Sequence, residues 1–115
     1  MTLKQKIEIL KDYDNTIITH TERGYLIDMV DDVERVDTIE ELEAWVDYQL
    51  TETAMLMDVA EVYQFFPPLA ITLYDDTTGE KLNANGKEDL AFIASRDVTA
   101  VDFRTNEIAV YVYMR

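Results

Sequence analysis

Hydrophobic residues near the start of this chain repeat with the period of an α-helix. Leu3, Ile7 and Leu10 fall on one face of residues 2–14. Thr2 is followed three residues later by a glutamine, which is the spacing of a capping box. We therefore expect a short helix at the N-terminus.

The next part of the chain has the composition of a β-hairpin. Thr16–His20 and Tyr25–Val30 are rich in β-branched residues, and the segment between them ends in a glycine, Gly24. Residues 31–37 are polar and acidic, so we interpret them as a connecting loop.

A second helix is predicted after Thr38, which stands three residues before a glutamate and can serve as the N-cap. Leu42, Val46 and Leu50 share one face of this helix, and we expect them to be buried. The sequence Thr-Glu-Thr at 51–53 interrupts the pattern and predicts a break or a bend there.

A third helix is predicted over residues 54–66. It ends before Pro67, because proline disfavours helical backbone at the residue that precedes it. Four residues are expected on its buried face: Leu56, Val59, Ala60 and Tyr63.

Two strand signals and one helix signal follow. Leu69–Tyr74 is expected to be a strand, and Lys81–Leu82 is expected to return beside it as a short strand. Asn85 and Glu88 have capping-box spacing and predict a helix over 86–95.

The C-terminal segments Val98–Arg104 and Glu107–Met114 predict a final hairpin. Both alternating rows of the last strand are apolar or aromatic, so we expect it to be central or covered on both faces. Hairpins mixed with helices predict an α+β fold, with an antiparallel sheet built from β-hairpins and three to four helices packed on it. The length of 115 residues favours a single domain over residues 1–115.

The charge of the chain is strongly uneven along the sequence. Residues 28–61 contain twelve acidic residues and one basic residue, and so carry −11 of the formal net charge of −14. A field of one sign selects which partners approach, so this stretch is the strongest functional signal in the sequence. The acidic residues are Asp28, Asp31, Asp32, Glu34, Asp37, Glu40, Glu41, Glu43, Asp47, Glu52, Asp58 and Glu61.

Composition argues against several classes of function. There is no cysteine, hence no disulfide and no thiolate chemistry. A pI near 4.2 argues against direct binding to nucleic acid or to anionic lipid, both of which attract Lys and Arg. The chain lacks an apolar run of membrane-spanning length, so we expect a cytoplasmic protein, in a bacterial host cell if it is phage-encoded.

Catalytic and metal signals are weak. His20 and Ser95 are the only residues of their types, and no nucleophile motif surrounds either of them. The run from Asn83 to Gly86 matches only the middle of a calcium loop, since Lys81 and Phe92 occupy its first and last ligand positions. We therefore expect no enzyme activity, no metal and no cofactor.

The acidic stretch is instead interpreted as a partner-binding surface. Glu40, Glu43 and Asp47 recur at helical spacing, which places neighbouring carboxylates about 5–6 Å apart. Phosphates on one DNA strand advance about 3.4 Å per step, so a staggered set of carboxylates can imitate them. The alternative is that these residues form only a solvated face. The predicted partner-binding residues are Asp28, Asp31, Asp32, Glu34, Asp37, Glu40, Glu43, Asp47 and Glu52.

One part of the chain has the pattern of a known family. Residues 35–66 contain Asp37-Thr38, Glu41-Leu42, Val46 and Asp58-Val59. Over this quarter of the chain the sequence resembles the small acidic Ocr-like anti-restriction proteins of phages, which mimic DNA. The resemblance implies a phage or mobile-element protein that occupies the DNA site of a host defence enzyme.

Together these patterns predict an acidic inhibitor of a nucleic-acid-binding host protein, such as a restriction enzyme or a CRISPR effector, acting by DNA mimicry. The expected partner is a basic protein, and the sequence leaves a homodimer open. One alternative is an immunity protein that neutralises a basic toxin nuclease. Another is a non-catalytic structural or assembly module of a phage or bacterium.

Overall fold

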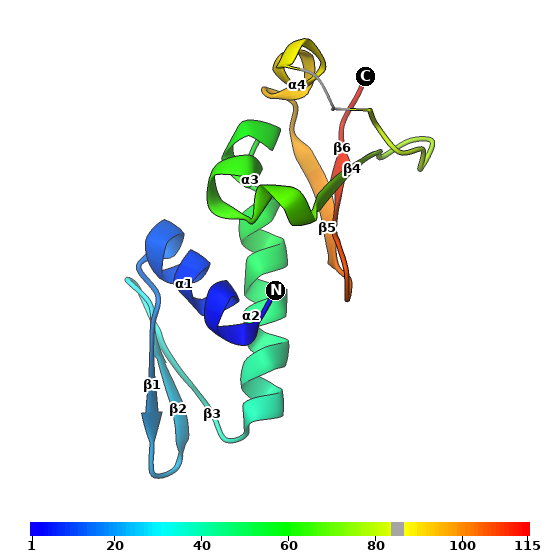
Figure 1. Ribbon diagram of the computed structural model, residues 1–115. Helices are drawn as coiled ribbons and strands as arrows, with labels where there is room; N and C mark the ends of the chain where they lie inside the picture. The colour runs from blue at the N-terminus through cyan, green and yellow to red at the C-terminus, as the bar shows by residue number, and fades with distance from the viewer. Residues whose placement is uncertain (84–86) are drawn as a thin grey trace. The chain divides into compact units, whose positions relative to one another are not determined.

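The computed structural model describes residues 1–83 and 87–115, with side chains for all of them except 87–89. The chain divides into two compact units, Met1–Leu50 and Thr51–Arg115, and each is described by itself. The single domain expected over residues 1–115 stays a prediction. The first unit contains α1 (Leu3–Asp14), β1 (Ile17–Thr21), β2 (Gly24–Asp28), β3 (Val33–Val36) and most of α2 (Ile39–Ala54) (Figure 1).

The second unit begins within the last turn of α2. Its elements are α3 (Val59–Phe65), a short 3₁₀ helix (Pro68–Ala70), β4 (Ile71–Asp75), α4 (Lys87–Ile93), β5 (Val98–Phe103) and β6 (Ile108–Val112) (Figure 1).

The α+β class predicted from the sequence is confirmed. Among the described residues there are four α-helices and two three-stranded sheets, with strand orders β1-β2-β3 and β4-β6-β5. Every pair in the first sheet is antiparallel, as is the β5–β6 hairpin, but β4 pairs with β6 in parallel. The long connection that contains α4 and β5 makes a parallel pair possible, whereas a short turn would not.

The N-terminal helix forms as predicted. Thr2 and Gln5 make the reciprocal bonds of a capping box, which satisfy two backbone N–H groups at the start of α1. The helix ends at Asn15, whose φ of 56° is in the left-handed region that asparagine tolerates. Leu10 is fully buried, and the neighbouring Ile9 is nearly so.

The first hairpin is confirmed, and Gly24 is essential to it. Thr21 pairs with Gly24 across a two-residue turn. The φ of Gly24 is +119°, and a Cβ atom there would lie 2.3 Å from the carbonyl oxygen of Val36 on β3. Only glycine allows the two strands to approach this closely.

The loop predicted over residues 31–37 is wrong in part. Val33–Val36 forms β3 and pairs with β2 through a turn in which Met29 and Asp32 exchange backbone hydrogen bonds. The sequence Val-Glu-Arg-Val lacks the alternation of a half-buried strand, because its two charged residues are adjacent, and this charge favoured the interpretation as a loop.

The start of α2 and its buried face are confirmed. The Thr38 hydroxyl accepts a hydrogen bond from the backbone N–H of Glu41 at 3.1 Å, and the Glu41 carboxylate reaches back to the backbone N–H of Asp37 at 3.2 Å. Leu42, Val46 and Leu50 are all buried.

The predicted break at 51–53 is wrong, because α2 continues to Ala54. Thr53 and Ala54 are both buried, so the apolar side of the helix continues through the Thr-Glu-Thr sequence. Short threonine side chains can be buried in a helix where a larger polar residue would be excluded.

The third helix is shorter than predicted over 54–66. Asp58 caps it and forms a capping box with Glu61, so α3 begins only at Val59. Leu56 therefore lies in the connection before the helix and is 79% exposed, and Ala60 is exposed as well. Val59 is buried as expected.

The second sheet places β6 at its centre, which confirms the expectation for the last strand. Its consecutive residues Ile108, Ala109 and Val110 are all buried. The short strand expected at Lys81–Leu82 is reduced to a single bridge between Lys81 and Tyr74.

The helix expected over 86–95 is present as α4, Lys87–Ile93. The proposed cap residue Asn85 and the side chain of its partner Glu88 lie outside the described residues. Ile93 is buried as expected, while Leu90 and Ala94 are half-buried.

The burial of α2 gives a test of stability. Leu42→Ala is expected to lower the free energy of unfolding by about 2–4 kcal/mol, because a core side chain is truncated. Thr38→Ala should cost about 1 kcal/mol through loss of the N-cap bond. Tyr48, 66% exposed on the same helix, is the control, and Tyr48→Ala should change little. Urea unfolding followed by circular dichroism measures all three. A larger loss for Thr38→Ala than for Leu42→Ala would contradict this account of α2.

Candidate functional site

Eight of the nine predicted partner-binding residues lie in the first unit, between the end of β2 and the middle of α2. We call residues 28–47 the acidic segment. It contains nine acidic residues and one basic residue, Arg35. All eight predicted residues are exposed except Asp47, which is half-buried. The ninth, Glu52, lies on α2 beyond the boundary between the units, and it is also exposed.

The first group of carboxylates surrounds the turn between β2 and β3. Asp28 is the last residue of β2, and Asp31 and Asp32 belong to the turn itself. The Asp32 carboxylate accepts a hydrogen bond from the backbone N–H of Val33 at 2.8 Å. Asp32 therefore helps to fix the turn while its charge remains at the surface.

Glu34 lies on the opposite face of this sheet from Asp28. It pairs with Ile27, a fully buried residue, and its carboxylate accepts a hydrogen bond from the indole N–H of Trp45 at 2.6 Å. This bond joins β3 to α2. Glu34 thus has a structural role in addition to its charge.

The third group is on α2, where Glu40, Glu43 and Asp47 recur at intervals of three and four residues. Such residues are neighbours on a helix surface. Glu40 and Glu43 are exposed, whereas Asp47 forms an ion pair with Lys6 of α1 at 2.6 Å. The Lys6 side chain is only 16% exposed, so this pair joins the two helices and offsets the charge of Asp47.

These contacts divide the predicted residues by role. Glu34 and Asp47 hold elements of the first unit together, and Asp32 fixes a turn. Asp31 and Glu40 are exposed at the turn and on the helix. The acidic segment is therefore a surface of fixed shape rather than a mobile charged tail.

The two candidate catalytic residues lie in different units. His20 is exposed on β1 and stacks on Tyr25, with ring centroids 4.6 Å apart. Ser95 is an exposed residue of the second unit. Within residues 1–83 and 87–115, no group of three or more His, Asp or Glu side chains is placed to hold a metal ion.

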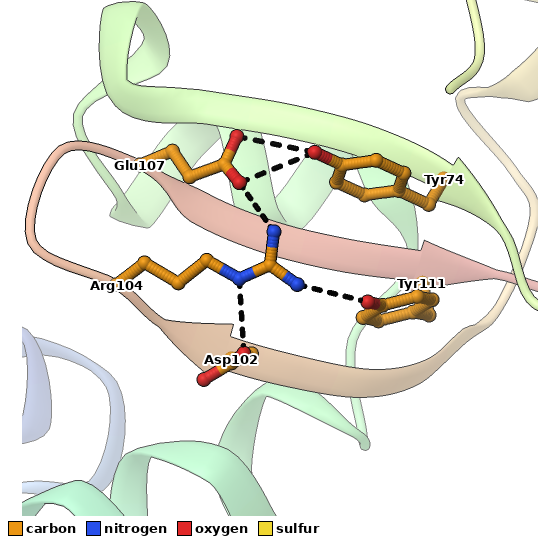
Figure 2. Close-up of polar contacts among 5 residues, drawn as sticks. All are labelled: Tyr74, Asp102, Arg104, Glu107 and Tyr111. Atoms are coloured by element: carbon orange, nitrogen blue, oxygen red, sulfur yellow. Dashed lines mark hydrogen bonds and ion pairs between the residues drawn. The ribbon is translucent and has the colours of Figure 1, made fainter. Parts of the chain in front are cut away.

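Sequence analysis did not identify a polar cluster in the second unit (Figure 2). Arg104 is at its centre, and each of its three guanidinium nitrogens donates a hydrogen bond. The acceptors are Asp102 at 3.0 Å, Glu107, and the hydroxyl oxygen of Tyr111 at 3.1 Å. The Tyr74 hydroxyl in turn donates to the Glu107 carboxylate at 3.2 Å.

The cluster covers one face of the second sheet. Tyr74 and Tyr111 are register partners on β4 and β6, and their rings stack with centroids 5.4 Å apart. Ala109 shares this face and is fully buried although its side chain is only a methyl group. Each guanidinium nitrogen is already bonded within the cluster, so we interpret the cluster as a brace over the sheet rather than an open anion site.

Hydrogen bonds in the cluster shift two pKa values. Bonds from Thr72, Arg104 and Tyr74 to the Glu107 carboxylate lower its pKa below the ordinary value. The carboxylates of Asp102 and Glu107 raise the pKa of Arg104 further. Both shifts favour the charged forms of the ion pair.

Local sequence signals could not have shown this cluster. Arg104 and Glu107 flank the final turn and suggest a pair, but Tyr74 is 33 residues from Glu107. Tyr74 reaches the cluster only because β4 pairs with β6 in parallel.

Comparison of the chain with protein-family models, with curated proteins and with solved structures gave no match. Within the described part of the chain, no helix combines the length and the apolar character needed to cross a membrane. The resemblance to Ocr-like proteins therefore stays a prediction.

The lowered pKa of Glu107 predicts a pH-dependent contribution to stability. A carboxylate with a lowered folded-state pKa stabilises the fold above its unfolded-state value near 4.5, and this contribution is lost as the pH falls through the lower folded-state value. Glu107→Gln should therefore be less stable than the wild type at neutral pH, and the difference should shrink in acid. Thermal unfolding across this pH range measures it.

Glu22→Gln provides the control, because Glu22 is an exposed glutamate in the turn after β1 and the charge change is the same. The difference in melting temperature between Glu22→Gln and the wild type should stay small at every pH. A difference in melting temperature between Glu107→Gln and the wild type that grows in acid would contradict the role given to the cluster.

Proposed function

We propose that this protein is an acidic inhibitor of a nucleic-acid-binding host protein, such as a restriction enzyme or a CRISPR effector, and that it acts by DNA mimicry. The observation that carries the proposal is the acidic segment, in which nine acidic residues and one basic residue are placed on ordered elements of one compact unit. A partner with a basic DNA-binding groove is the class of protein that such a surface attracts.

The single sign of charge on α2 supports DNA mimicry over the alternative of a merely solvated helix face. A solvated helix face commonly alternates acidic and basic residues, which form pairs along the helix. On α2 no Lys or Arg occurs between Ile39 and Ala54. The like charges repel each other and destabilise the fold, so a function that uses them would explain their retention.

A staggered set of carboxylates on α2 further supports mimicry. Residues at helical intervals of three and four have Cβ atoms about 5–6 Å apart, and phosphates on one strand advance about 3.4 Å per step along the axis, so a staggered set can imitate them. The turn between β2 and β3 supplies further carboxylates at Asp31 and Asp32. Inhibition in this way requires no catalytic residue and no cofactor.

The proposal predicts a salt-dependent association that depends on the acidic segment. The test variant combines Asp31→Asn, Asp32→Asn, Glu40→Gln and Glu43→Gln. Asp47 is retained, because its removal would leave Lys6 without this partner. Asn at 32 keeps an oxygen that can accept the Val33 N–H. Association with the captured partner should slow by about tenfold or more at low salt, and the wild-type rate should fall as salt rises.

The matched control neutralises four exposed acidic residues outside the segment, through Glu8→Gln, Asp12→Asn, Glu22→Gln and Glu80→Gln. It has the same net charge as the test variant and should associate nearly as fast as the wild type. The partner is captured from nuclease-treated bacterial lysate, and rates are measured by surface plasmon resonance. Duplex DNA should compete with the protein for the partner. A stable complex that holds the partner, DNA and this protein together would rule out DNA mimicry.

A further inference from the structure

The strand register defines two different faces on the sheet of the first unit. One face contains the row Ile18, Ile27 and Glu34, in which Ile27 is fully buried. Glu34 on this face is bonded to Trp45 of α2, so this face is directed toward the helix. The other face is therefore directed toward solvent.

The solvent face carries apolar side chains, two of which are more than half exposed. Ile17, Asp28 and Val33 form one row across the three strands, and Ile17 and Val33 are 55% and 56% exposed. Leu26, in the centre of the neighbouring row, is half-buried. At the adjacent turn, Val30 is 74% exposed. We call Ile17, Leu26 and Val33 the apolar patch.

Carboxylates lie beside the apolar patch. Asp28 is in the row between Ile17 and Val33, and the turn that follows β2 carries Asp31 and Asp32. Arg35, the only cation of the acidic segment, pairs with Leu26 in the next row, further from the turn. Carboxylates therefore flank the apolar patch on the side of the turn between β2 and β3.

A partner can reach the solvent face of the sheet more easily than the free edge of β3, because a side chain already bonds to part of that edge. Met29 and Asp32 form a hydrogen-bonded pair, and by the alternation of an antiparallel ladder the N–H of Val33 points away from β2. The Asp32 carboxylate accepts that N–H. A partner strand that added to this edge would have to displace it.

We infer that the solvent face of β1-β2-β3 is a docking surface for a basic protein partner that presents an apolar side chain among lysines or arginines. This rests on the proposed function, and it adds that the partner is held by apolar contact as well as by charge. A second copy of this chain is disfavoured as the occupant, because it would bring two sets of Asp28, Asp31 and Asp32 together. Nucleic acid is excluded by the same charge.

The two kinds of contact have different kinetic roles. Charges at the rim of an interface mainly change the rate of association. Apolar side chains in its centre mainly change the rate of dissociation, because they lose contact only when the complex separates. A surface that imitated phosphates alone would lack the second contribution.

The test uses two synthetic peptides as defined probes. One is rich in lysine with leucine and phenylalanine at its centre, and the other has equal charge with serines in their place. Titrations are followed by NMR of the methyl groups. The wild-type protein should bind the apolar peptide at least about fivefold more tightly, with shifts at Ile17, Leu26 and Val33. The double variant Ile17→Thr with Val33→Thr should bind both peptides alike, and threonine is well tolerated in strands.

The control variant combines Ile39→Thr with Tyr48→Ser, which removes exposed apolar side chains from α2 instead. It should keep the wild-type preference. Equal binding of both peptides by the wild type, a preference that survives in the patch variant, or self-association through the patch methyls would each overturn the inference. DNA takes no part in this test. Failure here with successful DNA competition would therefore remove the apolar docking face and leave DNA mimicry in place.

Discussion

The helical period of α2 separates two rows of residues that could not share one surface. Leu42, Val46 and Leu50 are buried, while Glu40 and Glu43 on the same helix are exposed. The buried row offsets the repulsion among the carboxylates, because burial of each large apolar side chain contributes about 1.5–3 kcal/mol. The arrangement of the first unit depends on this division. Trp45 and Asp47 of the same helix bond to β3 and α1 respectively.

The two units stabilise their polar surfaces differently. In the first unit the acidic residues are left largely without cations, and the contacts that do form tie α2 to its neighbours. In the second unit the exposed cation Arg104 bonds to Asp102, Glu107 and Tyr111 and lies over the ring of Tyr74. Arg104 offsets carboxylate charge within its own cluster, whereas the acidic segment holds nine acidic residues and one basic residue. This contrast supports the proposal that the partner binds the first unit.

Local signals in the sequence predicted much of the fold. The predictions of helix caps at Thr2 and Thr38 were correct, as was the prediction of the hairpin whose second strand begins at Gly24. Each of these features depends on residues only a few positions apart. The strand β3 was missed because its two central residues are charged and its apolar residues do not alternate with polar ones. The continuation of α2 to Ala54 was missed because the buried side of the helix includes Thr53. The late start of α3 was missed because Asp58 caps the helix one residue before Val59. The parallel pairing of β4 with β6 depends on tertiary structure, which no local pattern records.

For the candidate site, the acidic composition could be read directly, but the roles of its members could not. The contact between Lys6 and Asp47 spans 41 residues of sequence. The division of the sheet into a covered and a solvent face also required the strand register. A sequence pattern can therefore identify the charged residues of a surface. Only the fold shows which of them also bond to other elements of the same unit.

The close approach at Gly24 has a consequence for how this protein can evolve. The residue carries no charge and takes no part in the acidic segment, yet any side chain there would collide with the backbone of β3 at Val36. A displaced β3 would move the turn that holds Asp31 and Asp32. Sequence drift at the carboxylates themselves can be gradual, because one acidic residue can replace another nearby. Drift at position 24 has no such intermediate steps, so the position of these carboxylates depends on a neutral residue outside the acidic segment.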